Sequence, residues 1–95
     1  MAIKVLIFRH GAPERFEALK PLLQRLRTLA LAQTGYISGE TYSNLQNSSE
    51  YLVISTWASL EAWTTWHDHE ERATVQSRVD KLLEEPTVYH VFQNA

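Results

Sequence analysis

Two segments of the chain carry apolar side chains at odd and even positions alike. Residues 3–8 read IKVLIF, and residues 51–57 read YLVISTW. Successive side chains of a β-strand point to opposite faces, so a strand that is apolar at both parities has to be covered on both faces. We therefore expect two strands of one sheet with helices on one face and a further apolar surface on the other.

The rest of the sequence alternates between helical and extended patterns. Between Glu14 and Gln33 apolar residues recur every three or four positions, and Pro21 predicts a kink in this helix or a helix that is regular only after it. Ser59 is a suitable N-cap for a second helix, whose pattern falters at 68–70. The expected elements are strands 3–9, 36–43, 51–57 and 87–92 and helices 14–33 and 60–85.

The order βαββαβ predicts an α+β, ferredoxin-like domain, in which an antiparallel four-stranded sheet carries two helices on one face. Since 95 residues normally support one hydrophobic core, we expect a single domain over residues 1–95. Two helices cover only one face of the sheet. A second copy of the chain is the simplest cover for the other face, which predicts a homodimer through the sheet face.

The composition excludes several classes of site and partner. The chain has no cysteine, which removes disulfides, thiolate nucleophiles and Cys-ligated zinc. Its net charge is -2 and its basic residues are scattered, so no nucleic-acid partner is expected. The N-terminal apolar stretch ends at Arg9, and no run approaches the ~18 residues of a membrane helix. We expect a cytoplasmic protein without a membrane partner.

The aromatic residues are the first candidates for a binding site. Trp57, Trp63 and Trp66 could stack on a planar ligand, although aromatic side chains also supply core and dimer contacts. Tyr42 could donate a hydrogen bond to a polar atom of such a ligand. The run His67-Asp68-His69 has no third metal ligand at a helpful spacing, so we expect a solvated loop and no metal site.

Histidines at strand ends are the candidate catalytic residues. His10 and His90 could point, together with Phe8, into a cavity on the second face of the sheet. A histidine can act as a general base near neutral pH without a large change in its pKa. The alternative is that each is an ordinary hydrogen-bonded residue, and the sequence does not say which of the two, if either, acts as a base.

Two runs of residues resemble the antibiotic biosynthesis monooxygenase family. They are WASLEAWTTW at 57–66, followed by Glu71-Arg72, and ALAQTGYISGE at 30–40. The resemblance extends over essentially the whole chain and implies a dimeric α/β barrel, in which two ferredoxin-like protomers face each other sheet to sheet. Some family members oxidise phenols or quinols with O₂ and without metal or flavin, some degrade haem, and others have no assigned activity.

The resemblance carries over only part of the family's site residues. Trp57 and Trp63 match aromatic positions of the quinone-forming relatives, but Val53 stands where those carry asparagine, and Ser77, next to Arg78, stands where they carry arginine. Haem-degrading relatives share Trp66. Gln76 and Phe8 stand where those relatives carry the haem-ligating histidine and an asparagine, so haem degradation is not expected.

These observations lead to two hypotheses about function. The first is a cofactor-independent monooxygenase that oxidises a small phenolic or quinol-type aromatic bound between sheet and helices. The chain has no cysteine and no dinucleotide-binding glycine motif, so the electrons would come from the substrate itself. The second is a non-catalytic dimeric module of the same fold that binds a small hydrophobic ligand or serves as a structural partner.

Overall fold

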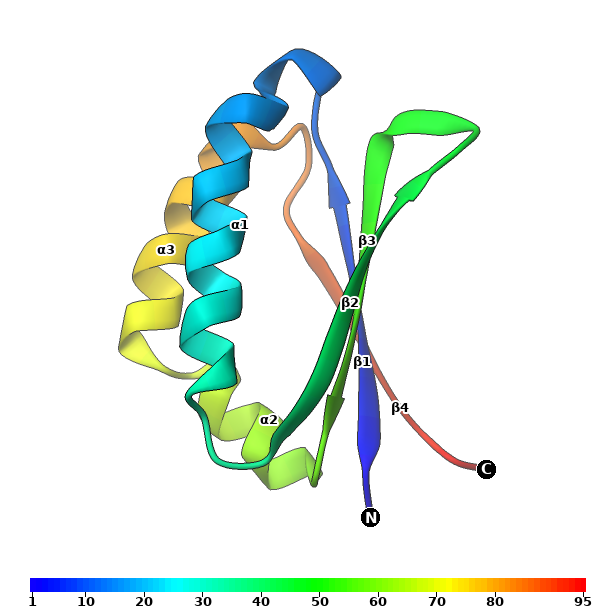
Figure 1. Ribbon diagram of the computed structural model, residues 1–95, viewed down its shortest axis with the longest axis vertical. Helices are drawn as coiled ribbons and strands as arrows, with labels where there is room; N and C mark the ends of the chain where they lie inside the picture. The colour runs from blue at the N-terminus through cyan, green and yellow to red at the C-terminus, as the bar shows by residue number, and fades with distance from the viewer.

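One antiparallel sheet forms one layer of the molecule, and all helices form the other (Figure 1). The computed structural model describes residues 1–95, and its strand order is β2-β3-β1-β4. The strands are β1 (Ile3–His10), β2 (Tyr36–Asn44), β3 (Asn47–Trp57) and β4 (Val88–Gln93). The helices are α1 (Phe16–Leu31), α2 (Leu60–His67) and α3 (Glu70–Leu82), and a short 3₁₀ turn, η1 (Pro13–Arg15), precedes α1.

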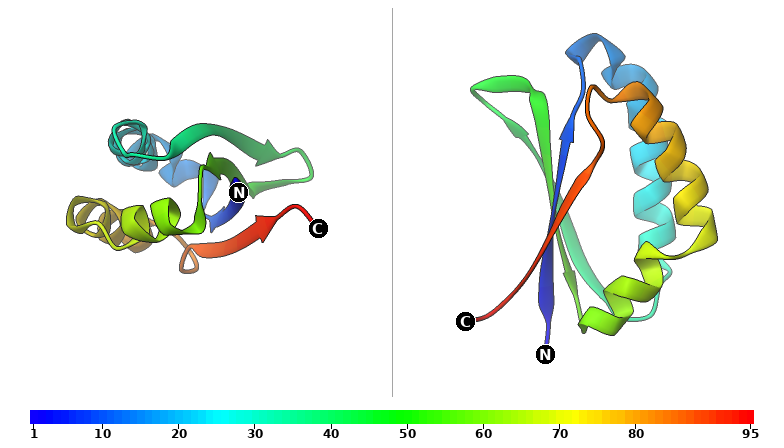
Figure 2. Two further views of the ribbon diagram at one scale, coloured as in Figure 1. Left: turned by 90° about the horizontal axis from the view of Figure 1, so that it is seen from below. Right: turned by 180° about the vertical axis from the view of Figure 1, so that it is seen from behind.

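This architecture confirms the predicted ferredoxin-like α+β fold. The two further views show α1, α2 and α3 on the same side of the sheet, as the split βαβ arrangement requires (Figure 2). None of the three helices has the length and apolar character needed to span a membrane. The opposite face of the sheet carries no helix, which is the feature that the doubly apolar strands predicted.

The pairing of β1 with β3 decides which side chains share a face. Ile3 pairs with Trp57, and the register continues to His10 opposite Glu50. Directly paired residues point to the same face of a sheet. The odd-numbered residues of β1 and β3 therefore face the helices, and the even-numbered residues face away from them.

The core lies between the sheet and the helices. Val5 and Val79 are fully buried there, and Leu19 of α1 is only 1% exposed. The helix α1 is continuous through Pro21, and its first predicted turn is the 3₁₀ turn η1. Pro21 is exposed, so water can hydrate the carbonyl that loses its helical partner.

The predicted falter in the second helix is a true break between α2 and α3. The Oγ atom of Ser59 accepts a hydrogen bond from the Ala62 amide at 3.1 Å, so it is the N-cap that the sequence predicted for α2. His69 caps α3 in the same manner, because its Nδ1 accepts from the amide of Glu71 at 3.2 Å. The break turns α3 along α1, so residues of α3 reach the cavity described below.

Candidate functional site

A cavity of about 320 Å³ lies between the sheet and the helices. Its wall includes residues of all four strands and all three helices. The volume is close to the lower end of the roughly 300–1,000 Å³ that ligand sites of proteins occupy. A cavity of this size accommodates a small planar molecule.

Three tryptophans form one wall of the cavity. Trp57, at the end of β3, is only 1% exposed, and its indole Nε1 donates to the Ser55 hydroxyl at 3.2 Å. Trp66 stacks on Trp57 with ring centroids 6.3 Å apart and an interplanar angle of 20°. Trp63 meets Trp57 at 65° and 5.9 Å. The structure thus brings together the three tryptophans that the sequence singled out, and they are part of the core as well as of the cavity wall.

A buried arginine contributes a polar group to the cavity wall. Arg9, the last odd-numbered residue of β1, is 6% exposed, and its Nη2 donates to Gln76 Oε1 at 3.1 Å. The amide nitrogen of Gln76 in turn donates to Asp80 Oδ1 at 2.8 Å and to Thr87 Oγ1 at 2.9 Å. The Nε of Arg9 is buried and has no hydrogen-bond partner within the chain. Burial lowers the pKa of Arg9 from its ordinary value.

A second buried arginine adjoins the first. Arg72 of α3 donates from Nη1 to the His67 carbonyl at 2.9 Å and from Nη2 to the Tyr89 hydroxyl. Burial raises the pKa of Tyr89, and the guanidiniums of Arg72 and Arg9 oppose this rise. The net direction is upward, so Tyr89 is a neutral hydroxyl at pH 7.

The charged residues at the cavity are all cationic. Arg9 and Arg72 are buried, whereas Lys20 and Arg27 reach it from the exposed side of α1. None of the cavity-lining residues is Asp, Glu or His. Asp80 does not line the cavity, but its carboxylate acts electrostatically on Arg9 and accepts a hydrogen bond from Gln76. The electrostatic field inside such a cavity favours a ligand with negative charge.

Four of the predicted site residues lie on the other face of the sheet. Phe8 and His10 lie on the face away from Trp57, because the register places the even residues of β1 opposite the even residues of β3. His90 pairs with Leu6 and contacts Phe8 edge to face at 5.7 Å, and Tyr42 pairs with Leu52. None of Phe8, His10, Tyr42 and His90 lines the cavity.

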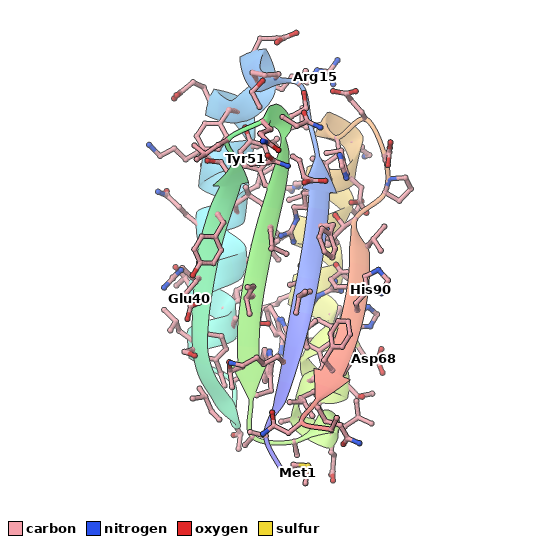
Figure 3. All side chains as sticks on the ribbon, turned by 90° about the vertical axis from the view of Figure 1, so that its right-hand side faces the viewer. Met1, Arg15, Glu40, Tyr51, Asp68 and His90 are labelled. Atoms are coloured by element: carbon pink, nitrogen blue, oxygen red, sulfur yellow. The ribbon has the colours of Figure 1, made fainter.

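Figure 3 looks onto this uncovered face, with His90 on β4 and Glu40 on β2. The hydroxyl of Tyr42 donates to Glu40 Oε2 at 3.0 Å, and His10 Nε2 lies 3.4 Å from Glu50 Oε2. Large apolar side chains surround these polar pairs, and several are half-buried or exposed. They are Leu6, Phe8, Leu52, Ile54, Val88 and Phe92.

The polar wall of the cavity is what the sequence analysis missed. Arg9 and Tyr89 could have been found from parity, because Arg9 follows Ile3, Val5 and Ile7 on the apolar odd positions of its strand. The sequence analysis named Arg72 only as part of a run that resembles a family motif. Nothing in the local sequence marks Gln76 as a residue that holds a buried arginine.

No part of the chain groups three or more His, Asp or Glu side chains in a way that could hold a metal ion. In the run 67–69, His67 Nδ1 lies 3.4 Å from Asp68 Oδ1, and His69 is the N-cap of α3. These residues thus have structural partners at the break between α2 and α3.

Several solved structures share this fold. A conserved protein from Methanosarcina mazei Go1 has a TM-score of 0.92 at 17% identity, over 100% of this chain and 94% of that chain. Rv0793 from Mycobacterium tuberculosis has a TM-score of 0.87 at 20% identity, with 100% and 96% covered. SnoaB, a cofactor-independent oxygenase from Streptomyces nogalater, has a TM-score of 0.79 at 18% identity, with 99% and 92% covered.

At these identities the solved structures establish the shared fold. A search of curated proteins finds no sequence that matches. Residues 2–78, however, match the family described as antibiotic biosynthesis monooxygenase, which is most of the chain. The chain therefore belongs to the antibiotic biosynthesis monooxygenase family.

Proposed function

We propose that the protein is a cofactor-independent monooxygenase that oxidises a small phenolic or quinol-type aromatic with O₂. The observation that carries the proposal is the cavity, which is lined by three tryptophans and two buried arginines. Membership of the family and the similarity to SnoaB, a cofactor-independent oxygenase, support the same class of reaction. A cytoplasmic location remains a prediction from the sequence.

The proposed reaction takes its electrons from the substrate. The bound phenolate gives one electron to O₂, which produces a substrate radical and superoxide. The two combine and form a C–O bond, and the resulting hydroperoxide loses water. One oxygen atom of O₂ remains in the quinone and the other leaves in the water, so the step consumes one O₂ and needs no further reductant.

The residues of the chain would position the ring and stabilise its charge. Trp57 and Trp66 provide flat apolar surfaces for the ring, and the buried guanidinium of Arg9 provides positive charge beside it. The role of His10 or His90 as general base stays a prediction, since both lie on the face of the sheet away from the cavity.

A homodimer through the uncovered sheet face is part of the proposal. Phe92 is 52% exposed and Val88 is 42% exposed on that face, beside the half-buried Leu6 and Ile54. A continuous apolar surface of this kind is costly in water at about 25 cal/mol per Å². A second copy of the same sheet would remove it from solvent.

A non-catalytic ligand-binding module is the alternative. Val53 lines the cavity where the quinone-forming relatives resembled by the sequence carry asparagine, and no histidine or carboxylate lines it. The cavity could then bind an aromatic molecule without providing a group that removes its proton.

Oxygen uptake separates the two functions. Protein treated with a chelator and freed of flavin would be mixed with a panel of dihydroxyaromatics in air-saturated buffer, with an oxygen electrode as the readout. We expect uptake above the buffer rate with at least one substrate, and one ¹⁸O atom in the quinone when ¹⁸O₂ is supplied. Binding of these compounds without uptake above buffer would contradict the monooxygenase and favour the alternative.

A further inference from the structure

Arg9 is a buried cation with an unused donor. It is 6% exposed, and its only side-chain hydrogen bond runs from Nη2 to Gln76 Oε1 at 3.1 Å. Its Nε has no partner within the chain, although the residue lines the cavity. An unpaired buried donor is costly, and more so when the group is charged, so such a group in a cavity wall indicates a ligand acceptor.

None of the residues that line the cavity carries a negative charge, and Asp80, whose charge acts on Arg9 and Tyr89, lies outside the wall. Gln76 is a neutral partner, and its Oε1 is already occupied by Arg9, while its amide nitrogen is held by Asp80 and Thr87. Arg72 brings a second positive charge to the same wall. A ligand oxygen that carries negative charge would therefore provide the hydrogen-bond acceptor and the compensating charge that the wall lacks.

Tyr89 offers a second donor at the same place. Its hydroxyl oxygen accepts from Arg72 Nη2, and no acceptor for its own proton is present within the chain. Arg9 and Arg72 both act electrostatically on Tyr89, so the three groups are neighbours in the wall. Because burial raises the pKa of Tyr89, its proton is retained at neutral pH and can be donated.

We infer that this cavity binds its aromatic ligand as an oxyanion, a phenolate in the first place, and that Arg9 is the residue that selects the negatively charged oxygen. The inference rests on the proposed function and adds to it a specificity-determining residue, because it names the group that distinguishes the ionised hydroxyl from the neutral one. Neutral aromatics of the same shape stack on the tryptophans but leave the Nε of Arg9 without an acceptor.

Binding of the anion also prepares the ligand for electron transfer. A site that favours the ionised form shifts the ionisation of the bound hydroxyl to lower pH, and the released proton goes to solvent water. The phenolate is the form that reduces O₂. The positive charges of the wall would thus promote the loss of the hydroxyl proton, for which the sequence analysis proposed a histidine.

Two probes that share a nitrophenyl ring and differ in one substituent test the inference without any oxidation. 4-Nitrophenol has an ionisable hydroxyl whose anion absorbs visible light, and 4-nitroanisole carries a methyl ether in its place. We expect the protein to bind 4-nitrophenol about 10- to 100-fold more tightly than 4-nitroanisole, as a charge-assisted hydrogen bond would. The bound phenol should ionise at a pH at least one unit below that of the free phenol.

The electrostatic surroundings of the probe are defined by the cavity wall. The charged groups facing it are Arg9 of β1, Arg72 of α3, and Lys20 and Arg27 of α1. The phenol hydroxyls of Tyr36, Tyr51 and Tyr89 belong to residues of the same wall. Asp80 lies outside the wall, and its negative charge acts on both Arg9 and Tyr89. All four charged groups at the wall are positive, so they favour the anion together.

The substitution Arg9→Met removes the charge and the donor but keeps an unbranched side chain. We expect it to abolish most of the preference for 4-nitrophenol while 4-nitroanisole binds as before. Arg25→Met is the matched control, because Arg25 is exposed on α1, pairs with Glu71 at 3.8 Å and does not line the cavity. Circular dichroism would establish that each variant is folded, and the comparison of the two probes on the parent protein needs no variant.

The outcomes separate this inference from the proposed function. Equal affinity for the two probes, unshifted ionisation of bound 4-nitrophenol, absence of binding, or an Arg9→Met variant that keeps the preference would each overturn the inference. Oxidation of quinols by such a protein would leave the proposed function intact. Conversely, preference for the anion that depends on Arg9, without any O₂ uptake, would support the inference and contradict the monooxygenase.

Discussion

The two faces of one sheet differ in what they can bind. On the helix side, Trp57 and Arg9 line a partly open cavity whose wall is largely apolar and carries positive charge. On the uncovered side, Leu6 and Ile54 lie in an apolar surface with half-exposed polar pairs such as His10 and Glu50. Residues that are adjacent in sequence contribute to opposite faces, so ligand binding and self-association can be changed separately by neighbouring substitutions.

The largest effect is expected on the helix side, from Trp57→Ala. Trp57 is 1% exposed and packs against Tyr36, Trp63 and Trp66, so its loss leaves a large hole in the core. We expect the free energy of unfolding to fall by about 3–5 kcal/mol, measured by urea denaturation. Trp57→Phe is the control and should lose clearly less. An unchanged urea midpoint for Trp57→Ala would show that Trp57 is not the centre of this core.

On the uncovered face, Leu6→Lys is expected to separate the proposed dimer. Leu6 pairs with Ile54 on one side and His90 on the other, so the charge would lie at the centre of the apolar surface. Sedimentation should give a dimer for the parent and an 11.0 kDa species for the variant. Ser77→Lys, on an exposed position of α3, should remain dimeric. A parent protein that already sediments as a monomer would contradict the proposed interface.

The same comparison shows how far the sequence could lead. The order of the elements and the break at Asp68 could be predicted from the sequence, because hydrophobic periodicity and capping residues are properties of short segments. Only the aromatic part of the cavity wall could be predicted from the sequence. Large aromatic residues such as Trp57 can be recognised in the sequence as candidates for a binding site. Arg9, in contrast, is one of several scattered basic residues, and only the register that pairs Ile3 with Trp57 shows that its side chain faces the helices. Register depends on contacts between distant segments, so the face that Phe8 and His10 share could not be taken from their own strand.

A moderate effect is expected from Tyr89→Phe. The variant keeps the ring in the cavity wall but removes the hydroxyl that Arg72 donates to and that could donate to a ligand oxyanion. Loss of one such bond corresponds to about a fivefold weaker affinity for 4-nitrophenol, with 4-nitroanisole as the control ligand. Titration calorimetry measures both, and an unchanged ratio would exclude Tyr89 from the anion site.

The pH dependence of 4-nitrophenol binding by the parent protein tests the role of Tyr89. Burial raises the pKa of Tyr89 above the ordinary tyrosine value of about 10. Below its folded-state pKa the hydroxyl is a neutral donor, and above it the tyrosinate repels an anion. Affinity for 4-nitrophenol should therefore persist through about pH 10 and fall only above it. A fall that begins well below pH 10 would contradict this assignment.

The smallest effects are expected from His10→Ala and His90→Ala, which test whether the two faces are independent. Neither histidine lines the cavity, so 4-nitrophenol affinity should stay within about twofold of the parent value. His10 forms only a half-exposed pair with Glu50 at 3.4 Å, and exposed pairs of this kind contribute about 0–1 kcal/mol. Isothermal titration and oxygen uptake, measured on both variants, would show any effect. If either variant lost most of its quinol oxidation while it kept its affinity, a histidine of the uncovered face would act as the general base that the sequence predicted, and the separation of the two faces would fail at that residue.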